Sequence, residues 1–176
     1  PHLFSSAASD VYKRQNNCIS GLLQHHEGLS ALLASTVNSY DRLQPASMAG
    51  YWANWAGDHR MVSIRTSTSS SNSARIEHRT ADGAGNPYIV TSSVLTASLL
   101  GIKNKYKLPK AEDLDGMENV RATKHVPSSL SKALNALEND NVLKSEIGEK
   151  FCNAFIEIKK DEATRLQDKN IDAVSY

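Results

Sequence analysis

The residue types best able to do chemistry in this chain are arginines in the segment from Arg42 to Arg79. That segment contains five arginines, no lysine, and only Asp58 and Glu77 as acids. From Lys103 to the last residue the preference reverses, with eleven lysines against two arginines. The guanidinium group is a rigid, permanently charged fork that matches carboxylate and phosphate oxygens. The arginine segment therefore indicates oriented anion recognition, and the lysine-rich part indicates an ordinary solvated helix surface.

Charged residues alternate in the stretch RIEHR, residues 75–79. Alternate side chains of a strand share a face, so Arg75, Glu77 and Arg79 are predicted to project together. The earlier stretch RMVSIR, residues 60–65, also has the pattern of a short strand. If the two strands pair, one polar face gathers Arg65, Arg75, Glu77 and Arg79, with Arg60 joining from the strand end and Arg42 from the preceding loop.

Five guanidiniums around one carboxylate repel one another unless an anion completes the cluster. Such a cluster suits a polyphosphate or a dicarboxylate, and Glu77 is free to ligate a hard cation such as Mg2+ or Mn2+. Phosphoryl transfer uses these parts, because cations surround the migrating group and a metal bridges its oxygens. The other interpretation is a surface salt-bridge network on a sheet. Spacing alone leaves both interpretations open.

Helices and loops must position these strands. Apolar residues recur at helical spacing from Asn16 to Leu33, which predicts a helix with one apolar stripe. His26 lies in that stripe and is interpreted as a packed residue with a hydrogen-bond partner. The neighbouring His25 faces elsewhere, so the pair makes a poor metal site. The polar stretch TSTSSSNSA, residues 66–74, predicts an exposed loop that is too long for a tight hairpin turn.

Three further helices are expected after the strands. Asn86-Pro87 predicts a helix start, because Asn caps free backbone donors and Pro loses no needed hydrogen bond there. The stretch that follows is apolar or small on nearly every side, which predicts a buried helix. Lys103 to Val126 predicts an extended connection, and Ser128 is expected to cap the next helix. A last amphipathic helix is predicted from Ile147, Phe151, Ala154, Phe155 and Ile158.

Composition excludes several classes of protein. With 176 residues, 40% apolar and 22% charged, the chain can bury a sizeable core. No apolar run approaches bilayer length, and the net charge of +1 argues against bulk attraction to nucleic acid or membrane. An RNA-binding sheet needs exposed aromatics among its basic residues, and His78 is the one aromatic ring in either strand. Cys18 and Cys152 lie far apart, so a reducing, cytoplasmic location is expected.

The first fifteen residues, PHLFSSAASDVYKRQ, show neither a signal-peptide core nor a clear helical or strand period. Two interpretations are open, namely sequence foreign to the protein and a native frayed terminus. Residues 1–15 are therefore expected to be a non-native or disordered leader, and the fold is expected in residues 16–176.

Several stretches, in order and at matching spacing, resemble the glutamine synthetase family. These are NSYDRL (38–43), DHRMVSIR (58–65) and RIEHRTADGAGNPY (75–88), with GLLQHH and SLSKALNALENDNVLKSEIGE resembling the flanking helices. The motifs are weak singly and specific in combination. The resemblance implies an α+β fold, the C-terminal part of a glutamine-synthetase-type catalytic domain with a short antiparallel sheet packed against several helices. It also implies that the β-grasp domain and the other metal ligands precede this chain.

The resemblance implies a reaction. Members of the family use ATP and Mg2+ or Mn2+ to phosphorylate the γ-carboxylate of glutamate, and ammonia or a primary amine then displaces phosphate to form a γ-glutamyl amide. The full-length protein is expected to form a homo-oligomeric ring. By position, Arg42 and Arg79 would contact glutamate, Arg60, Arg65 and Arg75 would hold the ATP phosphates, and Glu77 would ligate a metal. Arg60 and Arg65 are the expected catalytic residues.

Some residues of this sequence differ from the family pattern, and these differences bear on which amine is the substrate. Ammonia-using members carry a Glu in the loop after R-L-x-P that guards the site and helps deprotonate ammonium. Here RLQPASMAG places Met48 or a neighbour there, and no acid occurs between Asp41 and Asp58. The stretch resembles members that join glutamate to a larger amine, with Trp52 and Trp55 serving either an alkyl chain or packing. His59 stands where the family usually has Asn.

A second hypothesis is a non-catalytic family member with a binding or regulatory role. Retention of all five arginines with Glu77 favours catalysis, because a protein without the reaction has no need for the whole set. The missing guard acid and the absent upstream ligands keep the second hypothesis open. The chain by itself is expected to bind nucleotide weakly and to be inactive.

Overall fold

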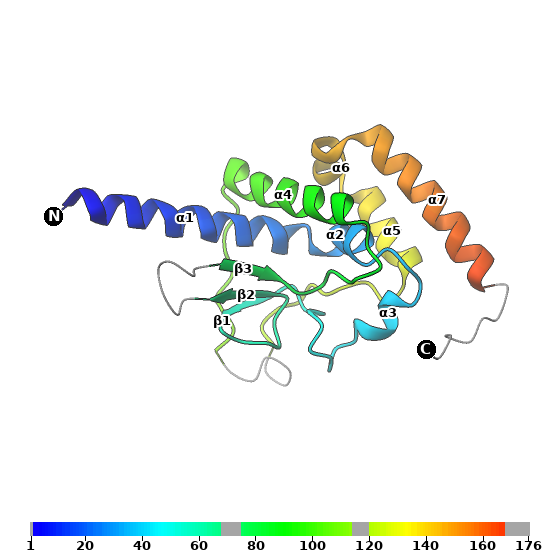
Figure 1. Ribbon diagram of the computed structural model, residues 1–176, viewed down its shortest axis with the longest axis horizontal. Coiled ribbons are helices and arrows are strands. Elements are labelled where there is room, and N and C mark those ends of the chain that lie inside the picture. The colour runs from blue at the N-terminus through cyan, green and yellow to red at the C-terminus, as the bar shows by residue number, and fades with distance from the viewer. Residues whose placement is uncertain (1, 68–74, 114–119, 168–176) are drawn as a thin grey trace.

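The computed structural model describes residues 2–67, 75–113 and 120–167. The fold is α+β, as the resemblance implies, and Figure 1 shows α4 on one side of α1 and the strands on the other. The helices are α1 His2–Gln24, α2 His26–Leu33, α3 Ser39–Arg42, α4 Pro87–Asn104, α5 Leu130–Asn139, α6 Asn141–Ile147 and α7 Glu149–Gln167. The strands are β1 Trp55–Gly57, β2 Ile64–Ser67 and β3 Arg75–His78. None of the described helices has the length and apolarity that a bilayer crossing requires.

The sheet has the strand order β1-β2-β3. Strands β2 and β3 pair antiparallel with Arg65 opposite Glu77, which confirms the predicted pairing of the two arginine stretches. Strand β1 pairs parallel with β2, an addition that the sequence did not predict because β1 has only three residues. Residues 60–63 form a turn rather than the start of β2. Of the predicted loop 66–74, the first two residues belong to β2 and residues 68–74 lie outside the described residues.

The predicted helix over residues 16–33 is interrupted at His25. The His25 Nδ1 lies 2.7 Å from the Asp140 carboxylate, and its Nε2 lies 3.3 Å from the Tyr106 hydroxyl. These contacts tie the junction of α1 and α2 to the start of α6. His26 is buried and its Nε2 donates to the Tyr51 carbonyl at 3.1 Å, which confirms its interpretation as a packed residue. Helix α1 begins at His2, and the native or foreign origin of residues 1–15 stays a prediction.

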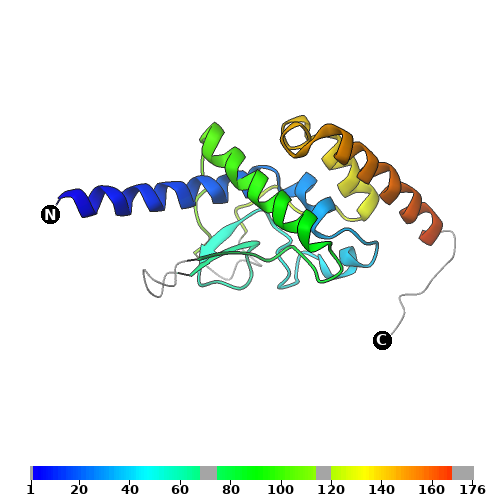
Figure 2. The same cartoon turned by 45° about the horizontal axis from the view of Figure 1, so that its top comes forward.

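Helices α1 and α4 cross at two glycines, and Figure 2 shows α4 running diagonally over α1. A Cβ atom added at Gly21 would collide with the Ala97 carbonyl oxygen, and one added at Gly101 would collide with the Asn17 carbonyl oxygen. No side chain larger than hydrogen fits at either position unless the helices separate. Glycine therefore sets the distance between the two helices, despite its low helix propensity.

Helix α4 begins as the sequence predicts, since the Asn86 side chain accepts from the backbone N–H groups of Tyr88 and Ile89. The prediction that α4 is buried on nearly all sides is wrong. The side of α4 that faces the rest of the structure carries small residues such as Ala97, whereas Leu95 and Leu99 are 58% and 59% exposed. An apolar composition predicts that a helix can be covered, but the arrangement of neighbouring elements decides which sides are.

Two details of the last helices also differ from the predictions. The cap of α5 is Ser129 rather than Ser128, and its side chain accepts from the Lys132 N–H. Of the predicted apolar stripe, Phe155 is buried as expected, but Phe151 and Ile158 are 42% and 64% exposed, and α7 buries Cys152, Ile156 and Ala163 instead. The prediction assumes one continuous helix that includes Ile147. Gly148, with φ +121°, instead separates α6 from α7, so Ile147 and Phe151 do not lie on the same helix.

At the glycine crossing, helix propensity and close packing predict opposite effects of a Gly→Ala substitution on stability. Helix propensity alone predicts that Gly21→Ala stabilises the protein by about 1 kcal/mol. We expect it instead to lower the free energy of unfolding by about 1 to 3 kcal/mol, because the added methyl group overpacks the crossing. Urea unfolding followed by circular dichroism measures the change. Gly83→Ala is the control, since a Cβ there meets nothing within 4 Å. A stabilised Gly21→Ala variant would contradict the crossing geometry.

Candidate active site

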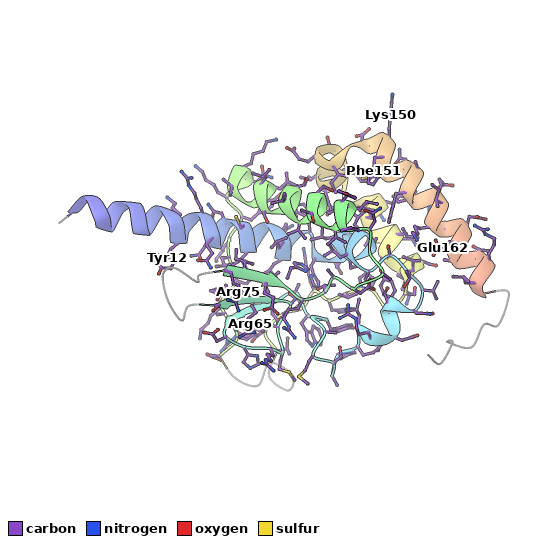
Figure 3. The ribbon with its side chains drawn as sticks, in the orientation of Figure 1. Tyr12, Arg65, Arg75, Lys150, Phe151 and Glu162 are labelled. Carbon is purple, nitrogen blue, oxygen red and sulfur yellow. The ribbon has the colours of Figure 1, made fainter. Side chains whose placement is uncertain are left out.

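The outer face of strands β2 and β3 carries the predicted charged cluster. Ile64 and Thr66 of β2 point to the buried side of the sheet, so Arg65 between them points outward and lies opposite Glu77. Arg75 lies on the same outer face of β3, two positions before Glu77, in register with Ser67. Figure 3 shows Arg65 and Arg75 on these neighbouring strands. The alternation predicted from the sequence therefore places three of the charged side chains on one face.

Glu77 is the centre of the contacts in this cluster. Its Oε1 accepts from the Arg79 Nη1 at 2.5 Å, and its Oε2 lies 3.6 Å from the Arg65 Nη1. The Arg65 Nη2 also lies 3.6 Å from the Asp58 Oδ1. Asp58 was not predicted as a member, because it follows β1 with a left-handed φ of +49° and lies outside the strand alternation. Arg65 therefore bridges two acids that come from different segments.

Arg42 and Arg79 are fixed at the turn that follows β3. The Arg79 backbone N–H donates to the Ser63 carbonyl at 2.8 Å, and its Nη2 donates to the Met48 carbonyl at 3.2 Å. The Arg42 Nη2 donates to the Thr80 carbonyl at 2.8 Å. The loop after α3 and the end of β3 are thus joined by two arginines. The sequence predicts that Arg42 joins the cluster from the preceding loop, and its contact with the Thr80 carbonyl brings it to the end of β3.

Arg60 and Arg75 are exposed and less fixed than the other three arginines. Arg60 lies in the turn between β1 and β2, and Arg75 lies at the start of β3. Neither side chain forms an ion pair within the described part of the chain, and the backbone of Arg75 belongs to the antiparallel ladder opposite Ser67. The structure therefore gathers the predicted residues around one face without bringing all five guanidiniums into contact with Glu77.

The guanidiniums of this face have unused hydrogen-bonding capacity. The Nε atoms of Arg65 and Arg79 are buried and have no partner among the described residues. Each guanidinium offers five N–H donors and no acceptor, so carboxylates from two acids leave donors over. Buried donors without a partner cost free energy. A bound anion with several oxygens would supply the missing acceptors, and the donor set therefore fits a phosphate or a second carboxylate.

Glu77 alone does not make a metal site. Over residues 2–67, 75–113 and 120–167, no group of three or more His, Cys, Asp or Glu side chains could hold a metal ion. Mg2+ takes near-octahedral oxygen ligands, of which proteins often supply one or two carboxylates. The described residues thus supply one carboxylate at the cluster centre, and the remaining ligands would have to come from elsewhere.

Two neutral histidines support the inner side of β3, behind Glu77. The rings of His78 and His26 have centroids 6.4 Å apart, and neither His78 nitrogen has a partner among the described residues. Burial, and to a smaller extent the neighbouring His26, lower the pKa of His78 to about 3. Burial also lowers the pKa of His26 to about 4, although the Tyr51 carbonyl partly opposes this. Both imidazoles are therefore uncharged at neutral pH.

Comparisons with known proteins identify the family of this chain. A family model described as "Glutamine synthetase, catalytic domain" matches residues 3–174, so the chain belongs to the glutamine synthetase family. The glutamine synthetase of Pyrococcus abyssi is 38% identical over 150 residues, covering 82% of this chain and 34% of the relative. The glutamine synthetase of Sulfolobus acidocaldarius is 38% identical over 159 residues, covering 85% of this chain and 34% of the relative.

Solved structures agree with this assignment. Structures described as "Apo GmaS without ligand" and "GmaS/ADP complex-Conformation 1" each match with a TM-score of 0.77 and 30% identity. The matches cover 89% of this chain and 36% and 37% of those chains. The fold class implied by the sequence is therefore confirmed. This chain spans only 34% of the length of the two glutamine synthetases.

The buried histidines generate a pH prediction. Near pH 5 an unfolded histidine, with an ordinary pKa of about 6.5, is protonated, whereas folded His78 is not. The unfolded state then binds one more proton, so stability is complete above pH 6.5 and falls as the pH decreases. We expect His78→Phe to reduce this fall near pH 5 by about 1.4 kcal/mol per pH unit. Urea unfolding at several pH values measures the slopes. Equal slopes for the two proteins would show that folded His78 protonates normally.

Proposed function

We propose that this chain is the C-terminal part of the catalytic domain of an ATP-dependent ligase, which joins glutamate to ammonia or a primary amine. Family membership supports the reaction class. The observation that carries the proposal is the outer face of β2 and β3, where Glu77 holds two guanidiniums whose buried Nε donors lack partners among the described residues. The Arg65 donor is suited to the oxygens of a phosphoryl group in transfer, and the Arg79 donor is suited to a substrate carboxylate.

The proposed chemistry has two steps. In the first, a γ-carboxylate oxygen of glutamate attacks the γ-phosphorus of ATP, the bond to the β,γ-bridging oxygen breaks, and ADP leaves. A carboxylate needs this activation because its own leaving group would be oxide, whereas the acyl phosphate can expel phosphate. In the second, the amine attacks the acyl carbon, phosphate leaves, and the amine loses a proton. The guanidiniums stabilise the charge that develops on phosphate oxygens in both steps.

Roles in this scheme follow the positions of the arginines. Arg60 and Arg65 are the proposed catalytic residues, and Arg75 would hold ATP phosphates from the same face. Arg42 and Arg79 would bind glutamate, which is supported by their shared attachment to the turn after β3. A divalent cation would neutralise phosphate charge when bound. The GmaS relative in complex with ADP supports nucleotide binding by this family of folds.

Met48 is the residue proposed to contact the amine. Its side chain is 61% exposed, and its carbonyl accepts from Arg79 at one end of the cluster. The loop between Asp41 and Asp58 contains no acid that could attract and deprotonate ammonium. A flexible, polarisable thioether suits an alkyl chain instead. We therefore propose a primary alkylamine as the acceptor, in a cytoplasmic, homo-oligomeric enzyme.

The reaction is tested by ADP release from the protein encoded by the complete reading frame. We expect release that requires glutamate and increases with methylamine, ethylamine or propylamine more than with ammonium. Arg65→Ala is expected to lower kcat by about a hundredfold or more, as loss of one transition-state donor does. The chain of 176 residues alone is expected to release no ADP. Nucleotide binding without ADP release by the complete protein would favour a regulatory role.

The metal role of Glu77 has its own test. In the complete protein, Glu77→Ala is expected to raise the Mg2+ or Mn2+ concentration needed for half-maximal activity by at least about tenfold. Asp58→Ala is the matched control, because it also removes an acid beside Arg65 but from a residue not proposed as a ligand. The two variants are compared by titrating the metal at saturating ATP. Equal metal dependence in both would show that Glu77 acts only as a partner of the arginines.

A further inference from the structure

The turn between β1 and β2, residues 58–63, carries Arg60 and is anchored at both ends. At its start the Asp58 N–H donates to the Thr66 carbonyl at 2.8 Å. At its end the Ser63 N–H donates to the Asn54 side chain at 3.1 Å, and the Ser63 hydroxyl donates to the Asn54 carbonyl at 2.9 Å. These bonds fix where the turn leaves β1 and where it joins β2. They do not reach the backbone around Arg60.

Inside the turn, a histidine ring supplies the backbone contact. The Met61 N–H donates to the His59 Nδ1 at 3.1 Å. This bond closes a ring of atoms that includes the Cα of Arg60. Within the part of the chain that the structure describes, it is the one side-chain hydrogen bond made by residues 59–62. The conformation at Arg60 therefore depends on His59 more directly than on either anchor.

The hydrogen bond defines the protonation state of His59. Nδ1 accepts a hydrogen bond here, so it carries no proton, and the neutral ring must carry its proton on Nε2. Asn makes the same contact to a backbone N–H two residues on, through its side-chain oxygen. The two residues differ in one respect, because the Asn oxygen is always an acceptor whereas an imidazole that gains a proton on Nδ1 no longer has an acceptor there.

We propose that His59 is a positioning residue for Arg60, and that its neutral Nε2–H form holds the turn that presents the Arg60 guanidinium to the reacting phosphate. The proposal rests on the proposed function of Arg60. Protonation of His59 releases the Met61 N–H and frees the backbone at Arg60. It also adds a positive charge near Arg60 and Arg65, with Asp58 and Glu77 as the acids of the surrounding segments.

The first test uses the 176-residue chain and needs no substrate. Nitrogen-15 NMR of the imidazole distinguishes the tautomers, and backbone spectra follow the Met61 amide. We expect the Nε2–H tautomer at neutral pH, and a Met61 amide shift that moves together with the protonation of His59. A proton on Nδ1 at neutral pH, or a Met61 amide that ignores the titration of His59, would overturn the proposal.

The second test uses the complete ligase and two variants of one residue. His59→Ala is expected to lower kcat by roughly tenfold with little change in the KM for glutamate, because Arg60 acts on the transferring group. His59→Asn is expected to recover most of that loss and to remove the acid-side decrease in kcat that His59 causes. Equal pH profiles for wild type and His59→Asn, or a wild-type kcat in His59→Ala, would overturn the positioning role.

The two tests separate this inference from the proposed function. If the complete protein has no ligase activity, the proposed function fails, while the NMR experiment still decides whether His59 holds the turn. If ligase activity is present and the Met61 amide does not follow His59, the proposed function stands and the role of His59 fails.

Discussion

The charged face of this protein depends on one carboxylate that separates guanidiniums of like charge. Glu77 contacts Arg65 from the neighbouring strand and Arg79 from its own segment. Without it, two permanently charged groups would face each other, and the remaining acid paired with either of them among the described residues would be Asp58, which contacts Arg65. With it, both arginines are held while their Nε donors remain unpaired among the described residues. The arginine side chains are thus fixed while some of their N–H groups remain unpaired. These N–H groups can bind an anion, whereas a fully paired network could not.

These ion pairs do not hold the fold together. Glu77 and Asp58 are partly exposed, and exposed ion pairs contribute about 0.2 to 1 kcal/mol each. A single fully buried leucine contributes more, about 1.5 to 3 kcal/mol. Leucines are buried in α1, α2 and α5, where they form the core beside the sheet (Leu22, Leu29, Leu32, Leu33, Leu134 and Leu137). The helices therefore supply the stability, and the sheet can keep a face whose charges are incompletely paired.

The side of β3 opposite Glu77 is lined by uncharged histidine rings, which leave the ion pairs of Glu77 undisturbed. A charged side chain behind Glu77 would compete for its carboxylate or repel the arginines. His78 and His26 instead keep uncharged rings there, because burial disfavours their protonated forms. These histidines lower the free energy of unfolding only when the pH falls, since the unfolded chain then binds protons that the folded chain excludes. The charged side and the neutral side of one short strand thus belong to a single electrostatic arrangement.

The sequence determined local features, because they depend on residues close together in the chain. Alternation of charge in RIEHR gave the outward face of β3, Asn86 and Pro87 gave the start of α4, and the combined motifs indicated the family. Tertiary structure decided which partners those residues meet. The break of the first helix at His25 and the exposed side of α4 depend on segments that are distant in sequence, and the contact of Asp58 with Arg65 depends on the parallel register of β1 and β2. Spacing specifies the direction in which a side chain points, whereas its environment depends on the packing of the whole chain.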